Sequence, residues 1–142
     1  MAKYHGRSVV FTIDDSGGTV RNISSDVDST DAPSTIDTAE VTGFGDAQKS
    51  YVTGQQDQKV SIKGNFNDTA LTGAHAVLSS LIGGTAGYTL QFMPAGSVSG
   101  KPKLYGEVLL TNYSLSAGVG GAVTFAADFV PVAGGSIVWG TI

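Results

Sequence analysis

Residues Lys103–Gly135 read KLYGEVLLTNYSLSAGVGGAVTFAADFVPVAGG and decide the fold of the chain. Apolar and polar residues alternate along Ala122–Val130, which is typical of a strand with one buried face. That face carries Val123, Phe125, Ala127 and Phe129. Before it, the glycine-rich segment Ser116–Gly121 predicts a tight turn. The stretch therefore predicts a long antiparallel hairpin.

The first strand of this hairpin, Lys103–Ser116, changes phase at its middle. Leu104 and Leu110 belong to one face of a regular strand, whereas Tyr113 falls on the other. A β-bulge inserts one extra residue, so a bulge near residues 111–112 would bring all three side chains to the same side. We therefore expect one long strand with a bulge at its middle.

Shorter strands are predicted on the N-terminal side of the hairpin. They span Ser8–Asp14, Thr19–Ser24, Ile36–Thr42, Gln58–Phe66 and Tyr88–Met93. In the fourth of these, Val60 and Ile62 alternate with polar residues, and Gly64 takes an inward position. A glycine inside a strand often marks a place where a neighbour comes close, and we expect such a neighbour here.

Ser25–Thr35 reads SDVDSTDAPST, and its polar composition predicts an exposed loop. Its aspartates resemble the start of a calcium-binding loop. An EF-hand loop has glycine at its sixth position and a bidentate glutamate at its twelfth. Counted from Asp26, these positions hold Asp31 and Asp37, so a solvated loop is the better interpretation.

One helix is predicted, over Asp68–Ile82. Its apolar stripe consists of Leu71, Ala74, Leu78, Leu81 and Ile82. Asn67 or Asp68 would cap its start, and Gly83-Gly84 would end it. With the strands, this helix predicts a mainly β protein: an antiparallel β-sandwich or split barrel with one short α-helix. A single domain over residues 1–142 is expected, with a flexible N-terminus over residues 1–7.

The segment Thr42–Asp57 is polar and contains several glycines, so it predicts a loop too long for an ordinary hairpin turn. It cannot form a core of its own. However, Phe44, Tyr51 and Val52 are apolar anchors that need a partner. We therefore expect this loop to lie between subunits and not to fold back on its own domain. The alternative is a disordered surface loop.

Charge is distributed unevenly over the 142 residues, whose net charge is −4. Up to Asp68 there are ten acids and six bases, whereas residues 69–142 hold two of each. Low charge is typical of buried subunit interfaces, so the C-terminal half favours self-association over a monomer with a Ser/Thr surface. The acidic balance argues against tight wrapping of nucleic acid, which needs clustered Lys and Arg. The chain has no cysteine, which fits synthesis in a reducing cytosol.

No motif for catalysis or metal binding is present. The two histidines, His5 and His75, are isolated in the sequence, and His75 is expected to be partly buried or at an interface. Neither a GxSxG nucleophile elbow nor a phosphate-binding loop occurs. No apolar run approaches the roughly 20 residues that span a bilayer. We therefore expect no enzyme activity, no cofactor, no metal and no membrane-spanning segment.

Val9–Gly135 resembles the tail tube proteins of long-tailed bacteriophages. The resemblance rests on Glu40–Phe66, on Lys103–Gly135 and on the helix between them. Its short GFGD motif, Gly43–Asp46, with Lys49 and Gly54 after it, is most similar to the non-contractile, siphophage-like members. The resemblance implies hexameric rings with a continuous inner β-barrel, stacked into the tube that conducts phage DNA into the host.

The resemblance also implies the partners and the location. The chain would bind copies of itself, a tape measure protein and tail-end proteins, and double-stranded DNA would pass through without specific binding. It would be made in the cytoplasm of a host bacterium and reside in the tail of the virion. Two alternatives remain open. One is a tube subunit of a contractile tail or type VI secretion system, and the other is a monomeric β-sandwich module that binds carbohydrate or protein.

Two groups of site residues follow. The inter-subunit loop would act through Thr42, Gly43, Phe44, Gly45, Asp46, Lys49, Tyr51 and Val52, which in related tubes correspond to a loop that stacks against the next ring. The channel wall should be polar and not strongly basic. Its candidates are Ser61, Lys63, Asn65, Thr89 and Gln91.

Overall fold

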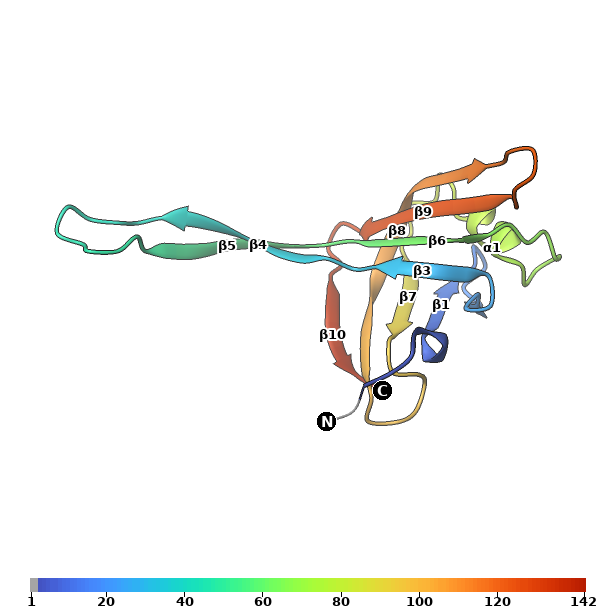
Figure 1. Ribbon diagram of the computed structural model, residues 1–142, viewed down its shortest axis with the longest axis horizontal. Helices are drawn as coiled ribbons and strands as arrows, with labels where there is room; N and C mark the ends of the chain where they lie inside the picture. Colours follow the sequence, from blue (N-terminus) through green and yellow to red (C-terminus); the bar gives the residue numbers. More distant parts are fainter. Residues whose placement is uncertain (1–2) are drawn as a thin grey trace.

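A computed structural model describes residues 3–142 and shows a β-rich body from which a narrow two-stranded ribbon projects (Figure 1). The strands are β1 (Val10–Asp14), β2 (Val20–Asn22), β3 (Val27–Asp31), β4 (Ser34–Glu40), β5 (Tyr51–Gln58), β6 (Val60–Asn65), β7 (Tyr88–Met93), β8 (Pro102–Ser116), β9 (Thr124–Pro131) and β10 (Ile137–Thr141). The helices are the 3-10 turn η1 (Gly6–Ser8) and α1 (Ala74–Ser80). All strand pairs are antiparallel, so the prediction of a mainly β protein with one short α-helix is confirmed.

The body is a single eight-stranded sheet in the order β2-β1-β7-β8-β9-β6-β3, with β10 also on β8. The long strand β8 holds it together. Its first half pairs with β7 and β10, and its second half pairs with β9. The register shifts between Leu110 and Asn112, so the predicted bulge is confirmed. The bulge separates the half of β8 that pairs with β7 and β10 from most of the half that pairs with β9, so β8 belongs to two layers of the folded sheet.

The sheet folds over on itself to enclose the core. Phe11 of β1 and Phe129 of β9 are not on neighbouring strands, yet their ring centroids are 6.3 Å apart. The layer β2-β1-β7-β8-β10 therefore faces the layer β8-β9-β6-β3. Burial of alternate strand residues is the main stabilising contribution of such a core. Its fully buried side chains include Ile13, Val60, Ile62, Leu90, Leu104 and Val108.

The helix is shorter than the sequence pattern predicts. Leu71 has a φ of +68°, a left-handed conformation that a right-handed helix cannot contain, and α1 begins only after Gly73. Leu71 and Ile82 are 71% and 61% exposed, so their placement on the buried stripe was wrong. Ala74 and the other two stripe residues, Leu78 and Leu81, are buried as expected.

The cap of the helix also differs from the prediction. Neither the Asn67 nor the Asp68 side chain caps α1. The Ala74 N–H donates to the Asp26 carboxylate at 3.1 Å, and the His75 N–H donates to the backbone carbonyl of Asn67 at 3.1 Å. The Asn67 amide holds the same carboxylate at 3.0 Å. A carboxylate at the first turn of a helix satisfies a free N–H and complements the helix dipole. Asp26 therefore ties the start of β3 to the start of the helix.

The predicted loop Ser25–Thr35 is in fact occupied by strand β3, which pairs with β6. Its side chains are polar because only one face lies on the core, where Val27 packs. The expected close neighbour of Gly64 is present. A Cβ built there would lie 1.9 Å from the backbone oxygen of Asp26, so no larger residue fits without a backbone shift.

The predicted loop Thr42–Asp57 is only partly a loop. Tyr51–Gln58 forms β5 and pairs with β4 from Ser34 to Glu40. Alternation gave no signal here, because both faces of this ribbon are exposed and neither needs to be apolar.

Candidate assembly surfaces

The ribbon β4-β5 stands away from the body, as Figure 1 shows at its left. Every residue of both strands is exposed except Gln58, where the ribbon joins the body. Its exposed apolar side chains are Ile36, Tyr51 and Val52. An isolated two-stranded hairpin is marginally stable in water and presents open backbone edges. The ribbon therefore has the properties of a segment that another surface supports.

The end of the ribbon, which we call the tip, is residues 42–50. Its turn is closed by the side chain of Asp46, whose carboxylate accepts from the Gly43 N–H at 2.6 Å. The Ser50 N–H donates to Thr42 Oγ1 at 2.9 Å and closes the base. Phe44 is fully exposed between these contacts. The tip is thus a hydrogen-bonded loop that presents one aromatic ring to solvent.

The structure brings the predicted inter-subunit residues together. Thr42, Gly43, Phe44, Gly45, Asp46 and Lys49 are in the tip, and Tyr51 and Val52 begin β5 beside it. They lie at the far end of the ribbon and do not fold back on the body (Figure 1).

A second surface is the outer side of the layer β8-β9-β6-β3, which we call the polar face. On β6 it presents Ser61, Lys63 and Asn65, between inward residues that are buried. Their cross-strand partners on this face are Ser29, Asp31, Thr124, Ala126 and Asp128. Asn112 of β8 donates to the Asp128 carboxylate at 3.3 Å. The face carries both signs of charge, so it is not a basic surface.

The two outer strands of this layer each have an open edge. β3 pairs only with β6. β8 pairs with β7 only as far as Val108. Beyond that residue, its second half has β9 on one side and no other strand from residues 3–142 on the opposite side. Unpaired edges of this kind attract further strands.

Thr89 and Gln91 are not part of the polar face. They lie on β7 in the other layer, opposite Glu107 and Tyr105 of β8. Thr89 Oγ1 donates to a carboxylate oxygen of Glu107. The sequence identified both as outward residues of a strand but could not indicate which layer that strand belongs to.

Sequence reasoning also missed an aromatic cluster beneath the helix. His75 Nδ1 is 2.8 Å from the Tyr113 hydroxyl, and its ring packs against Phe66 in a tilted arrangement at a centroid distance of 5.0 Å. Burial raises the pKa of the Tyr113 phenol above its ordinary value. His75 is half-buried and holds the helix against β8. Its contacts with Tyr113 and Phe66 join α1 to the sheet, so we interpret His75 as a structural residue.

Chemistry-bearing groups are sparse in the part of the chain that the structure describes. Within residues 3–142, no group of three or more His, Asp or Glu side chains is placed to hold a metal ion. The only salt bridge among these residues joins Arg21 to Asp15 at 3.0 Å. No described helix has the length and apolar character to cross a membrane.

The chain matches known proteins in structure but not in sequence. No protein-family model matches the chain, and no curated protein matches it. Solved structures do match over nearly the whole chain, and it shares the fold of chains from the SPP1 tail tube and from the tail of a gene transfer agent particle. One match is the tail of an empty gene transfer agent particle with C6 symmetry, at 17% identity and a TM-score of 0.72, covering 96% of this chain and 99% of that chain.

Two further matches extend this likeness. The SPP1 tail tube is 10% identical with a TM-score of 0.75, covering 99% of this chain and 80% of that chain. A chain of the anti-feeding prophage baseplate, 6-fold symmetrised, is 7% identical with a TM-score of 0.70, covering 98% of this chain and 96% of that chain. At these identities the likeness establishes the fold, and function must be argued from the surfaces.

Proposed function

We propose that the protein is the structural subunit of a siphophage-like tail tube, assembled as stacked hexameric rings. The observation that carries this proposal is the bare ribbon β4-β5, whose side chains lack cover from their own body. A monomer gains nothing from such a segment, whereas a subunit in a stack can lay it on a neighbour. The sixfold symmetry of the matching gene transfer agent tail supports rings of six.

The open edges of the polar layer supply the contact within a ring. The β3 edge of one subunit would pair with the β8 edge of the next, in the segment after Val108. Repeated six times, this pairing closes a continuous inner barrel and removes every open edge of that layer. The outward residues Ser61, Lys63 and Asn65 would then line the channel.

Such a wall suits passage of DNA without retention. Tight binding of a duplex requires many Lys and Arg side chains at phosphates. On the polar face Lys63 is accompanied by Asp31 and Asp128, so the ring of lysines is balanced by carboxylates. DNA in transit would therefore meet hydroxyl, amide and mixed charged groups. The protein would do no chemistry, and its site would be the virion tail.

Further partners belong to the same proposal. A tape measure protein would fill the channel before DNA ejection, and tail-end proteins would start and stop the stack. The likeness to the anti-feeding prophage baseplate chain favours a second candidate, a tube subunit of a contractile tail or type VI secretion system. A monomeric binding module is disfavoured because the exposed ribbon would have no role in it.

Negative-stain electron microscopy of the purified protein at high concentration tests the proposal. Hollow tubes or six-membered rings of uniform width are expected, and size-exclusion chromatography should show growth with concentration. A strict monomer at every concentration and ionic strength, together with saturable binding of a sugar or small ligand, would overturn it.

A further inference from the structure

A short uncharged segment lies beside the open half of β8, on the core side of the sheet. It consists of residues 81–87, LIGGTAG, and joins α1 to β7; we call it the connection. At its start, His75 of α1 contacts Tyr113 of β8, whose ring packs on the core. At its end, β7 pairs with Val108. Because β9 pairs with Val108 from the other side, the connection reaches β8 on the side of its open edge.

Ile82 is the largest exposed side chain of the connection, and 61% of its surface is accessible. Gly83, Thr85 and Ala86 are exposed beside it. One exposed isoleucine is ordinary on a protein surface. However, this one is in an uncharged segment next to an unpaired strand, and depletion of charge is typical of the core of an interface. Ile82 is therefore a candidate contact residue of the β8 edge.

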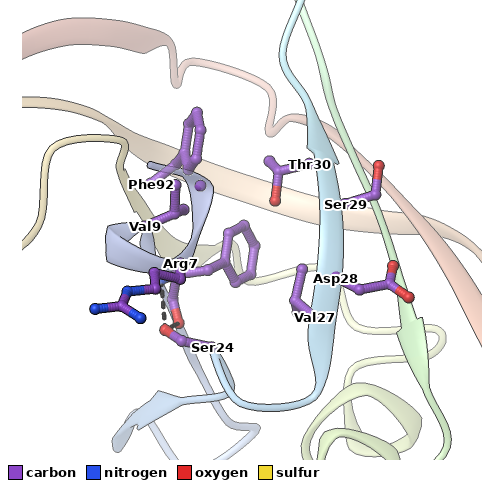
Figure 2. A pocket seen from close by; sticks show the side chains of 10 residues that line it. Arg7, Val9, Ser24, Val27, Asp28, Ser29, Thr30 and Phe92 are labelled. Atoms are coloured by element: carbon purple, nitrogen blue, oxygen red, sulfur yellow. Dashed lines mark hydrogen bonds between the residues drawn. The ribbon is translucent and has the colours of Figure 1, made fainter. Parts of the chain in front are cut away.

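The β3 edge has a pocket on its core side. The pocket lies between β1 and β3, which are not paired, and has a volume of about 380 Å³. Figure 2 shows that Val27 and Thr30 of β3 are directed into this space, whereas Asp28 and Ser29 are directed away from it. Two of the polar residues that border the pocket therefore belong to the opposite side of the strand.

The wall formed by the other layer is largely apolar. Phe11 is buried, and Val9 and Phe92 are half-buried, so they keep apolar surface that an occupant would remove from water. Ser24 Oγ already accepts from the Phe11 N–H at 2.8 Å. The Arg7 side chain is directed away from the space (Figure 2). The interior thus suits an aliphatic side chain, and its polar groups lie at the margin.

Pairing of the two open edges would bring the connection and the pocket together. The pairs β3-β6, β6-β9 and β9-β8 are all antiparallel, so β3 and β8 run in opposite directions. Rotation about the axis of a ring preserves the direction of a strand, so β8 of the next subunit would meet β3 in the antiparallel sense. The sheet then continues with its core side on the same side. The connection of one subunit would consequently face the pocket of its neighbour.

We propose that Ile82 of one subunit inserts into the pocket between β1 and β3 of the next subunit in the ring. This inference rests on the proposed function, because it uses the pairing of β3 with β8. Ile82 would be a contact between subunits only, since β9 and β6 lie between β8 and β3 within one subunit. The side chain would seal the core side of the joint, where backbone pairing alone leaves Val9 and Phe92 partly exposed.

Engineered disulfides test the contact because the chain has no cysteine. Ile82→Cys combined with Thr30→Cys should give a ladder of covalent oligomers on a denaturing gel after mild oxidation. The ladder should end at six subunits if the ring has the sixfold symmetry of the matching tail. Val20→Cys with Thr30→Cys is the matched control. Val20 is 58% exposed but lies on β2, beside β1 on the pocket side of the subunit, so this pair should give no ladder.

Ile82→Asp provides an independent measurement. Because Ile82 is exposed in the monomer, the melting temperature of the monomer should not change. The concentration at which rings appear in electron microscopy should rise about tenfold or more, since a carboxylate cannot replace the buried aliphatic group. Val20→Asp should leave that concentration unchanged.

The outcomes separate this contact from the assembly itself. Rings that form from Ile82→Asp at the normal concentration, or rings without a ladder from the Ile82 and Thr30 cysteine pair, would overturn this inference and leave the proposed function standing. A ladder that continues beyond six would place the contact between rings and would overturn it as well. Absence of rings and tubes in the unmodified protein would overturn both proposals.

Discussion

The carboxylate of Asp26 accepts a hydrogen bond from the backbone N–H of Ala74 at 3.1 Å, across 48 positions of sequence. The same carboxylate binds the Asn67 amide, and the Asp26 carbonyl accepts from the Asn65 N–H. One residue thus fastens the beginning of β3, the end of β6 and the first turn of α1. The position of the helix over the core depends on this junction.

Asp26→Ala should therefore destabilise the subunit. It removes hydrogen bonds to a charged acceptor, each worth about 1.5–3 kcal/mol, and leaves the Ala74 N–H without its partner. We expect a loss of about 2–3 kcal/mol in urea-induced unfolding of the monomer. Asp31→Ala is the matched control, since Asp31 is exposed and should change stability by less than about 0.5 kcal/mol. Equal effects of the two variants would contradict the assigned role.

Gly64→Ala should be costly for a steric reason. The added methyl would lie 1.9 Å from the Asp26 carbonyl oxygen, which belongs to backbone and cannot swing aside. Overpacking of this kind typically costs about 1–3 kcal/mol, and here the upper end is expected. Gly118→Ala, where nothing lies within 4 Å, should leave the melting temperature nearly unchanged. Thermal unfolding followed by circular dichroism compares the two.

Replacing Thr42–Lys49 by Asn-Gly should separate folding from assembly. The dipeptide closes a two-residue hairpin turn, so the ribbon is retained while the tip is lost. Because the tip makes no contact with the core, the melting temperature of the monomer should not change. Electron microscopy should show no tubes. Tubes of normal width from this variant would contradict any role of the tip in stacking.

Asp15 should titrate below its ordinary range. The Thr19 N–H and then the Arg21 side chain stabilise its charged form and lower its pKa from 3.8. A depressed pKa in the folded state contributes stability above the unfolded value, and that contribution disappears as the pH falls through the folded value. Carboxyl NMR titration should give a midpoint below 3.8 in the native protein and a higher one in Arg21→Ala. An unchanged midpoint in the variant would show that Arg21 plays no part.

Local patterns in the sequence predicted the elements that are themselves local. β7 has the predicted bounds, Tyr88–Met93, and the bulge of β8 lies where its apolar positions change phase. The helix start was misplaced because its cap comes from Asp26, far along the chain, and the left-handed Leu71 leaves no mark in the periodicity.

The candidate surfaces were predictable only in part. Phe44, Tyr51 and Val52 were visible as apolar residues in a polar segment. Strand β5 was not predicted, because a ribbon with two solvent-exposed faces shows no alternation of apolar and polar residues. Ser61, Lys63 and Asn65 were correctly grouped by alternation on one strand. Alternation assigns a face within a strand and carries no information on the layer to which the strand belongs, so it could not show that Thr89 and Gln91 lie in the other layer.

The two open edges of the polar layer belong to different strands, and this difference governs how copies add. A contact between β3 of one copy and β8 of another joins unlike surfaces, so it cannot close a two-fold pair. Each added copy pairs with one open strand edge of the growing assembly and exposes a new open edge of its own. An arc of any length therefore keeps one unpaired strand at each end, and only completion of the circle removes both. Incomplete rings would be short-lived, and the subunit should pass from monomer to closed ring with little between.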